Sequence, residues 1–138
     1  MIITGITDGI VIDHIPAGRG MDLYRDLQID DKGYQVALIK NAPSSKRGRK
    51  DVLKINAPIE INLEILGFMD PEITVNIIRG GKKVHKFHPV LPEQLSNIIF
   101  CKNPRCITST EQELSHVFQL TNREAGIYRC IYCQSKAS

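Results

Sequence analysis

The sequence lacks a run of apolar residues long enough to span a membrane. No stretch approaches the roughly 20 consecutive apolar residues that a spanning helix needs. Met1 is followed by an Ile-rich alternating segment, where a secretory signal would place a basic and then an apolar region. We therefore expect no membrane association and a cytoplasmic location.

Sequence motifs of several common enzyme classes are also missing. The chain has no Gly-x-Ser-x-Gly nucleophile elbow and no Walker-type glycine loop that ends in Lys-Ser or Lys-Thr. Its four histidines are scattered. Asp13 and His14 form an adjacent acid–base pair, but adjacent side chains on a regular strand point to opposite faces. The sequence therefore predicts a protein that is not an enzyme.

A strong excess of one charge is absent too. The 138 residues include 18 basic and 15 acidic ones, for a net charge of +3, which is too small to indicate nucleic-acid binding. Basic residues do gather at residues 46–50 and 82–88. These stretches are either two solvated loops or two parts of a pocket for a polyanion such as a triphosphate.

Cysteine is scarce, and its spacing is informative. The chain has four, at Cys101, Cys106, Cys130 and Cys133, which read C-x4-C, then 23 residues, then C-x2-C. Two close pairs separated by a long loop allow four thiolates to converge on one tetrahedral ion, and Zn2+ suits four sulfur ligands. This spacing predicts one structural zinc site. The alternative, two disulfides, requires an oxidising compartment.

Hydrophobic periodicity and turn residues divide the chain into short elements. We expect a strand, a helix, two strands, a helix and two strands, followed by two strands near residues 118–120 and 127–131. The expected strands are residues 2–12, 34–39, 52–55, 73–78 and 83–87; the helices are 21–27 and 59–68; the polar turn and loop are 13–20 and 41–48.

This order predicts an α+β fold with two domains. The first, residues 1–92, has the ferredoxin-like βαββαβ order, with two helices on one face of a four-stranded sheet and an extra hairpin strand. Residues 89–92 contain two prolines and form a stiff connector. The second domain, residues 93–138, is predicted to be small, β-rich and zinc-binding.

A binding role is the better prediction for the polar residues of the first domain. Asp13 can accept hydrogen bonds from ribose hydroxyls, His14 can add a donor, and Lys54 and Lys86 can place charges on phosphates. Each also has an ordinary alternative. Asp13 and His14 would serve as a turn-capping pair, and the lysines would be exposed side chains.

Several segments resemble the regulatory chain of aspartate carbamoyltransferase, almost from end to end. They are VIDHIPAG at 11–18, GRKD at 48–51, LKI at 53–55, CKNPRCI at 101–107 and YRCIYC at 128–133. The resemblance implies an allosteric domain that binds CTP, ATP or UTP, and a zinc domain that docks on catalytic trimers. It also implies a regulatory-chain homodimer and control of pyrimidine biosynthesis, in which CTP inhibits and ATP activates.

Carried over by position, the resemblance implies two groups of nucleotide-binding residues. Phosphate and ribose contacts fall on Asp13, His14, Lys54 and Lys86, with Lys50 near enough to assist, and the base-reading wall falls on Ile3, Thr4, Gly5, Ile6, Asn76 and Ile78. Two other functions remain open: a zinc-ribbon module that binds nucleic acid, and a free-standing nucleotide sensor. Residues 101–138 hold five basic and three acidic residues, which is a weak footprint for nucleic acid.

Overall fold

The computed structural model describes residues 6–29 and 32–137. These residues fall into two compact units, which divide between Val90 and Leu91. The sequence-based expectation places the boundary two residues later, between 92 and 93. Each unit has its own sheet, and in the described residues no helix is long and apolar enough to cross a membrane.

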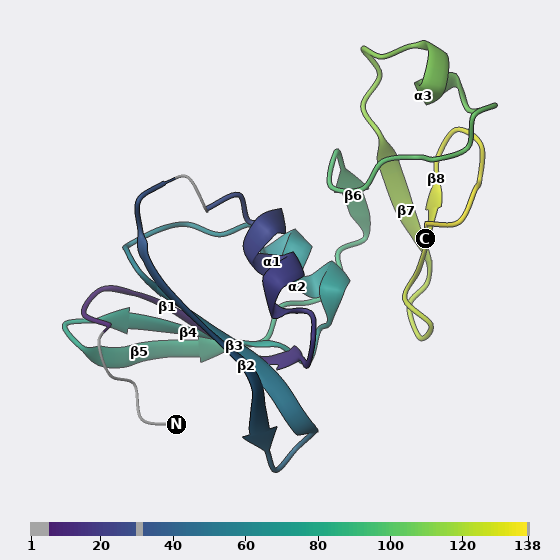
Figure 1. Cartoon of the computed structure of the whole chain (residues 1–138). Coiled ribbons are helices and arrows are strands. Elements are labelled where there is room, and N and C mark those ends of the chain that lie inside the picture. The colour runs from purple at the N-terminus through teal and green to yellow at the C-terminus, as the bar shows by residue number, and fades with distance from the viewer. Residues whose placement is uncertain (1–5, 30–31, 138) are drawn as a thin grey trace. The chain divides into compact units, whose positions relative to one another are not determined.

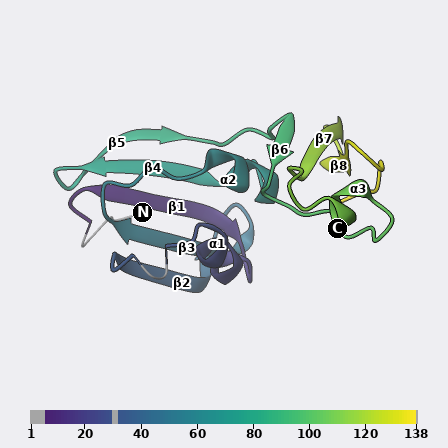
Figure 2. The same cartoon turned by 90° about the horizontal axis from the view of Figure 1, so that it is seen from above.

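The first unit is a five-stranded antiparallel sheet with two helices on one face (Figure 1). Figure 2 shows the strands side by side in the order β2-β3-β1-β4-β5. The strands are β1 (Gly9–Pro16), β2 (Gln35–Ser44), β3 (Gly48–Asn56), β4 (Thr74–Arg79) and β5 (Lys82–Phe87); the helices are α1 (Gly20–Asp26) and α2 (Leu63–Met69). The predicted α+β fold with a ferredoxin-like first domain is confirmed, and β5 is the extra hairpin strand.

Strand periodicity explains why this sheet buries both faces of its centre. Alternate residues of β1, such as Ile10 and Ile12, face the helices, where they pack in one core with Leu23 of α1 and Leu66 of α2. Val11, which lies between them, packs on the opposite face in a second apolar cluster with Ile6, Val52 and Ile78. Side chains on a strand alternate between faces, so β1 supplies both cores.

Two predicted boundaries between strands and loops are wrong. The turn expected at 13–20 begins only after Pro16, because β1 continues to that residue through an irregularity between Ile12 and Ile15. The polar loop expected at 41–48 is mostly strand, since cross-strand pairing carries β2 to Ser44 and β3 back from Gly48. Pro43 is tolerated there because β2 is an edge strand.

The second helix begins later than expected. Its first residue is Leu63, and Asn62 caps it by accepting a hydrogen bond from the backbone N–H of Glu64 at 2.9 Å. Asn is a strongly preferred N-cap residue, whereas Pro58, the expected start signal, lies before the helix in a segment without regular secondary structure. The predicted Gly80-Gly81 turn between β4 and β5 is confirmed, and both glycines have positive φ angles.

The second unit is a three-stranded antiparallel sheet, in the order β6-β7-β8. Its elements are β6 (Gln94–Ser96), β7 (Val117–Asn122), β8 (Ile127–Cys130) and a short helix that the sequence did not predict, α3 (Ile107–Thr110). Leu95, Phe118 and Tyr128 are buried, one from each strand, and the Tyr128 hydroxyl donates a hydrogen bond to the Pro92 carbonyl at 2.5 Å. This is a small core for an independent unit.

Candidate functional site

The four cysteines converge in the second unit. Cys101 follows β6, Cys106 precedes α3, Cys130 ends β8, and Cys133 lies in the turn after it. All four Sγ atoms lie within 4.8 Å of one another. The Sγ atoms of Cys101 and Cys133 are 3.6 Å apart, and those of Cys106 and Cys130 are 3.7 Å apart.

These separations fit a zinc ion and exclude disulfides. Sulfurs bonded to one tetrahedral zinc at about 2.3 Å lie about 3.8 Å from one another. A disulfide would bring two sulfurs to about 2.05 Å, and all four cysteines are free. Because four thiolates leave no open coordination position, the site is structural. The prediction of one structural zinc site is confirmed.

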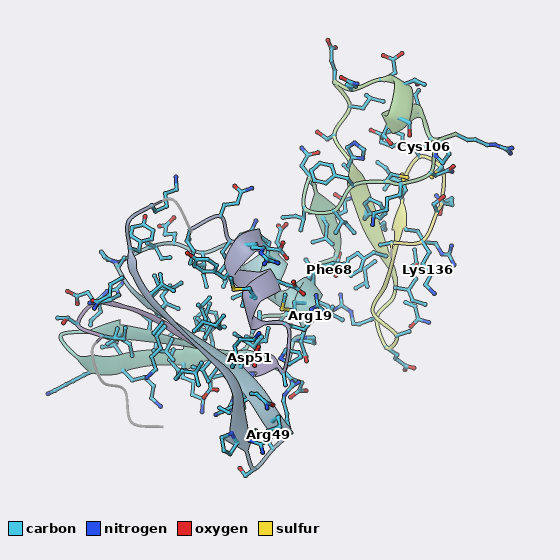
Figure 3. The ribbon with its side chains drawn as sticks, in the orientation of Figure 1. Arg19, Arg49, Asp51, Phe68, Cys106 and Lys136 are labelled. Atoms are coloured by element: carbon cyan, nitrogen blue, oxygen red, sulfur yellow. The ribbon has the colours of Figure 1, made fainter. Side chains whose placement is uncertain are left out.

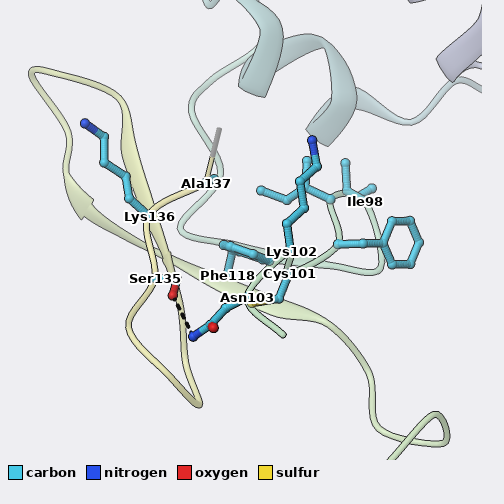
Figure 4. Close-up of a pocket in the computed structure, with 10 residues that line it drawn as sticks. Ile98, Cys101, Lys102, Asn103, Phe118, Ser135, Lys136 and Ala137 are labelled. Carbon is cyan, nitrogen blue, oxygen red and sulfur yellow. Dashed lines mark hydrogen bonds between the residues drawn. The ribbon is translucent and has the colours of Figure 1, made fainter. Parts of the chain in front are cut away.

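Neighbouring polar groups hold the cysteines in place. The Thr108 hydroxyl donates to the Sγ of Cys106 at 3.1 Å, and this hydrogen bond lowers the pKa of the thiol, which favours the thiolate that a metal needs. Cys106 and Cys130 are buried (Figure 3 labels Cys106). The Asn103 side chain donates to the Ser135 hydroxyl at 3.2 Å and so ties the first cysteine loop to the end of the chain (Figure 4).

A hollow of about 440 Å³ lies beside this site. Its lining is mainly apolar, including Ile98 and Phe118, and Lys102 and Lys136 extend from it in Figure 4. Four apolar side chains of the same unit are also 40–59% exposed: Phe100, Ile107, Ile131 and Tyr132. Exposed apolar side chains are typical of a protein-contact surface where they form one continuous patch.

A second pocket, of about 190 Å³, lies on the helix-free face of the sheet in the first unit. Of the predicted binding residues, it brings together Asp13 and His14 from β1, Lys50 from β3, Asn76 from β4 and Lys86 from β5. Two residues that the sequence analysis did not select, Thr74 and Lys83, complete its lining.

Hydrogen bonds and one ion pair organise the pocket around Asp13, which is buried. Its Oδ1 lies 3.0 Å from the Lys50 ammonium and accepts the backbone N–H of His14 at 2.6 Å. The His14 Nδ1 lies 3.1 Å from the Thr74 hydroxyl. Burial lowers the pKa of His14, against the opposing effect of Asp13, so this imidazole is neutral at pH 7.

Backbone irregularity explains how two adjacent residues line one pocket. The expectation that Asp13 and His14 point to opposite faces is wrong, because the pairing of β1 with β3 shifts between Ile12 and Ile15. His14 has a φ of 60°, a left-handed conformation that non-glycine residues seldom adopt. A bulge of this kind redirects a side chain beside a site.

Three other predicted residues lie beside the pocket. Lys54 is opposite Val11 in the β1–β3 pairing, and Val11 is opposite Asn76, so Lys54 shares their face without lining the pocket. Ile6 and Ile78 belong to the apolar cluster on the same face. The remaining predicted wall residues, Ile3, Thr4 and Gly5, lie outside the described residues.

The last residue of the GRKD segment, Asp51, follows the pocket residue Lys50 in β3 and holds nearby backbone in place. It is fully buried, and its carboxylate accepts the backbone N–H groups of Gly18 at 3.2 Å, Gly20 at 2.9 Å and Asn41 at 2.8 Å. A Cβ at Gly20 would come within 2.8 Å of the same carboxylate. Asp51 (Figure 3) therefore fixes the loop between β1 and α1, which directly follows the strand that carries Asp13 and His14.

Comparisons with known proteins assign both parts of the chain to a family. The family model described as "Aspartate carbamoyltransferase regulatory chain, allosteric domain" matches residues 1–90, and the one described as "Aspartate carbamoyltransferase regulatory chain, metal binding domain" matches residues 93–138. Among curated relatives, a Clostridium tetani protein is 48% identical over 134 residues, covering 96% of this chain and 93% of its own. A Bifidobacterium longum protein is 43% identical over 137 residues, covering 99% of both.

A Clostridium botulinum protein is 47% identical over 133 residues, which cover 96% of this chain and 91% of its own. All three relatives are named aspartate carbamoyltransferase regulatory chains. The resemblance noted in the sequence and the prediction of a non-enzyme are thus confirmed. The chain belongs to the family of aspartate carbamoyltransferase regulatory chains, which are non-catalytic, allosteric subunits.

Proposed function

We propose that this chain binds a nucleoside triphosphate (CTP, ATP or UTP) in the pocket of its first unit and passes the signal to catalytic trimers of aspartate carbamoyltransferase. The observation that carries the proposal is the convergence of Asp13, His14, Lys50 and Lys86 from three strands on one small hollow. Their chemistry suits the parts of a nucleotide. Ammonium groups attract phosphates, and a carboxylate accepts hydrogen bonds from ribose hydroxyls.

The surroundings of the pocket support the same ligand class. The cluster of Ile6, Val11, Val52 and Ile78 is buried on the same sheet face, with the amide of Asn76 beside it, and in this proposal the base lies against the edge of the cluster. Lys54 is in register with Val11 and Asn76 across the neighbouring strands β3, β1 and β4. It can reach the ligand from the β3 side of the sheet. In this proposal Ile6, Asn76 and Ile78 contact the base, and the lysines contact the phosphates.

The second unit provides the contact with the catalytic chain. The proposed allosteric domain comprises residues 1–92, and the proposed docking domain comprises residues 93–138. The exposed side chains Phe100, Ile107, Ile131 and Tyr132 support a protein-binding surface, and the zinc ion holds together the loops that carry most of them. Two copies of the chain form a regulatory dimer in the cytoplasm, and neither nucleic acid nor a membrane is a partner.

Nucleotide binding would shift a two-state equilibrium of the whole assembly, through the connector at residues 89–92. An effector acts only through its different affinity for the two states. Coupling free energies of this kind are typically about 1–3 kcal/mol. The control of pyrimidine biosynthesis then depends on the pocket and the docking surface acting in one assembly.

The test is reconstitution of the zinc-loaded chain with the catalytic trimer from the same organism. We expect a complex heavier than the trimer by light scattering, and a carbamoyltransferase rate that responds to CTP and ATP. Chelating zinc before mixing should abolish the complex. A chain that binds CTP but leaves the trimer's mass and rate unchanged would be a free-standing nucleotide sensor, and the regulatory proposal would be wrong.

A further inference from the structure

A register shift in β5 brings Lys83 into the pocket. Asn76 and Ile78 of β4 are two residues apart and share one face, and they pair with Lys86 and Lys83 of β5, which are three residues apart. Between these two pairs, β5 therefore contains one residue more than β4. On a regular strand, residues three apart point to opposite faces, so the extra residue is what places both lysines on the same face.

Among the described residues, Lys83 and Lys86 are the pocket lysines whose charges are not balanced by an acidic partner. The ammonium of Lys50 is held by Asp13 at 3.0 Å. Within residues 6–29 and 32–137, neither Lys83 nor Lys86 forms an ion pair, although both line the pocket. Two like charges that face one hollow repel each other, and an anion placed between them relieves that repulsion.

The spacing of the two lysines indicates what kind of anion they hold. Their ladder positions are two residue steps apart, about 7 Å along the strand. A single phosphate can contact both ammonium groups only if the two flexible side chains bend toward each other. A polyphosphate chain carries charge along its length, so it can contact both ammonium groups at once. The spacing therefore suits an anion with several phosphates better than one with a single phosphate, whatever the base.

We propose that Lys83 is a further phosphate-binding residue of this pocket and that, together with Lys86, it selects triphosphates over monophosphates. This inference rests on the proposed nucleotide function and adds a specificity residue to it. The assignment follows from the shifted pairing of β5 and from the lack of an acidic partner for Lys83 among the described residues.

Calorimetric titration of the zinc-loaded full chain with CTP, CDP and CMP tests the proposal. Lys83→Met should weaken CTP binding about tenfold, which matches the loss of one charged contact, and change CMP binding less than twofold. Lys83→Arg should restore most of the CTP affinity because the charge is kept. The matched control is Lys82→Met. Lys82 is the exposed neighbouring lysine, pairs with Arg79 and does not line the pocket, so its loss should leave all three affinities unchanged.

The outcomes separate this inference from the function on which it rests. If Lys83→Met binds CTP as tightly as the wild type, or weakens CTP and CMP equally, Lys83 does not read phosphate number and the inference fails, while the nucleotide site stands. If the wild-type chain binds none of the three nucleotides, both proposals fail. Lys83 is exposed, so circular dichroism should show an unchanged fold in every variant.

Discussion

The zinc site and the lysine pocket hold their functional groups in place by different means. In the second unit, four cysteine side chains surround one metal site, and the apolar core is small, with Leu95, Phe118 and Tyr128 at its centre. In the first unit, the pocket lies on a five-stranded sheet with buried clusters on both faces. From this difference we expect the second unit to depend on its metal for folding and the first to depend on its core.

Removing the zinc should give the largest effect, and this effect should be confined to the second unit. Structural zinc ions in small domains contribute apparent binding free energies of about 10–16 kcal/mol. Cys130→Ser, which removes a buried ligand, should therefore unfold residues 91–138 and leave the first unit folded. Hydrogen exchange read by mass spectrometry measures this: protection of β6–β8 should disappear while that of β1–β5 persists. Equal loss in both units would show that they do not fold independently.

The next largest effect concerns the carboxylate that supports the loop beside the pocket. Asp51→Asn leaves one of the three backbone N–H donors facing an amide NH2 group, so we expect the free energy of unfolding to fall by about 3 kcal/mol. Urea unfolding of the first unit measures it. The control is Asp22→Asn, at an exposed ion pair, which should cost less than about 1 kcal/mol. Similar losses in the two variants would contradict the role given to Asp51.

The third effect is smaller and concerns the affinity for CTP when Lys86 is substituted. Lys86→Met removes one unbalanced charge from the pocket without touching the core, so CTP affinity should fall about tenfold while assembly and stability stay unchanged. Calorimetry gives the affinity, and light scattering with the catalytic trimer gives assembly. Unaltered CTP affinity would remove Lys86 from the site. Lys82→Met again serves as the matched control.

The smallest effect is a pH dependence of stability from His14. Burial lowers its pKa below 6.5 in the folded state, so the unfolded state binds more protons. Stability from this group is therefore full above pH 6.5 and is lost as the pH falls from there toward the folded pKa. His14→Gln should lose less stability than the wild type between pH 7.5 and 5 in urea unfolding. If the wild type and the variant lose the same amount, the His14 contribution is absent.

Much of the architecture could be predicted from local patterns. The order of strands and helices in the first unit, the glycine turn between β4 and β5, and the four-cysteine zinc site all follow from periodicity, turn residues and spacing, whereas β6 and α3 of the second unit were not predicted. The misplaced boundaries have tertiary causes. Residues 41–48 are polar, yet pairing with a neighbouring strand extends both β2 and β3 through most of them. The start of α2 depends on which residue caps it, and Asn62 does so.

The two close cysteine pairs and the order of the elements in the first unit can be read from the sequence, because each depends on residues that are near each other in the chain. Only the tertiary structure decided the pocket, because its residues come from four strands and two of its features depend on irregular pairing. The shift after Ile12 places His14 beside Asp13, and the shift in β5 places Lys83 beside Lys86. Such shifts are set by how strands fit together across a sheet, which no single stretch of sequence encodes.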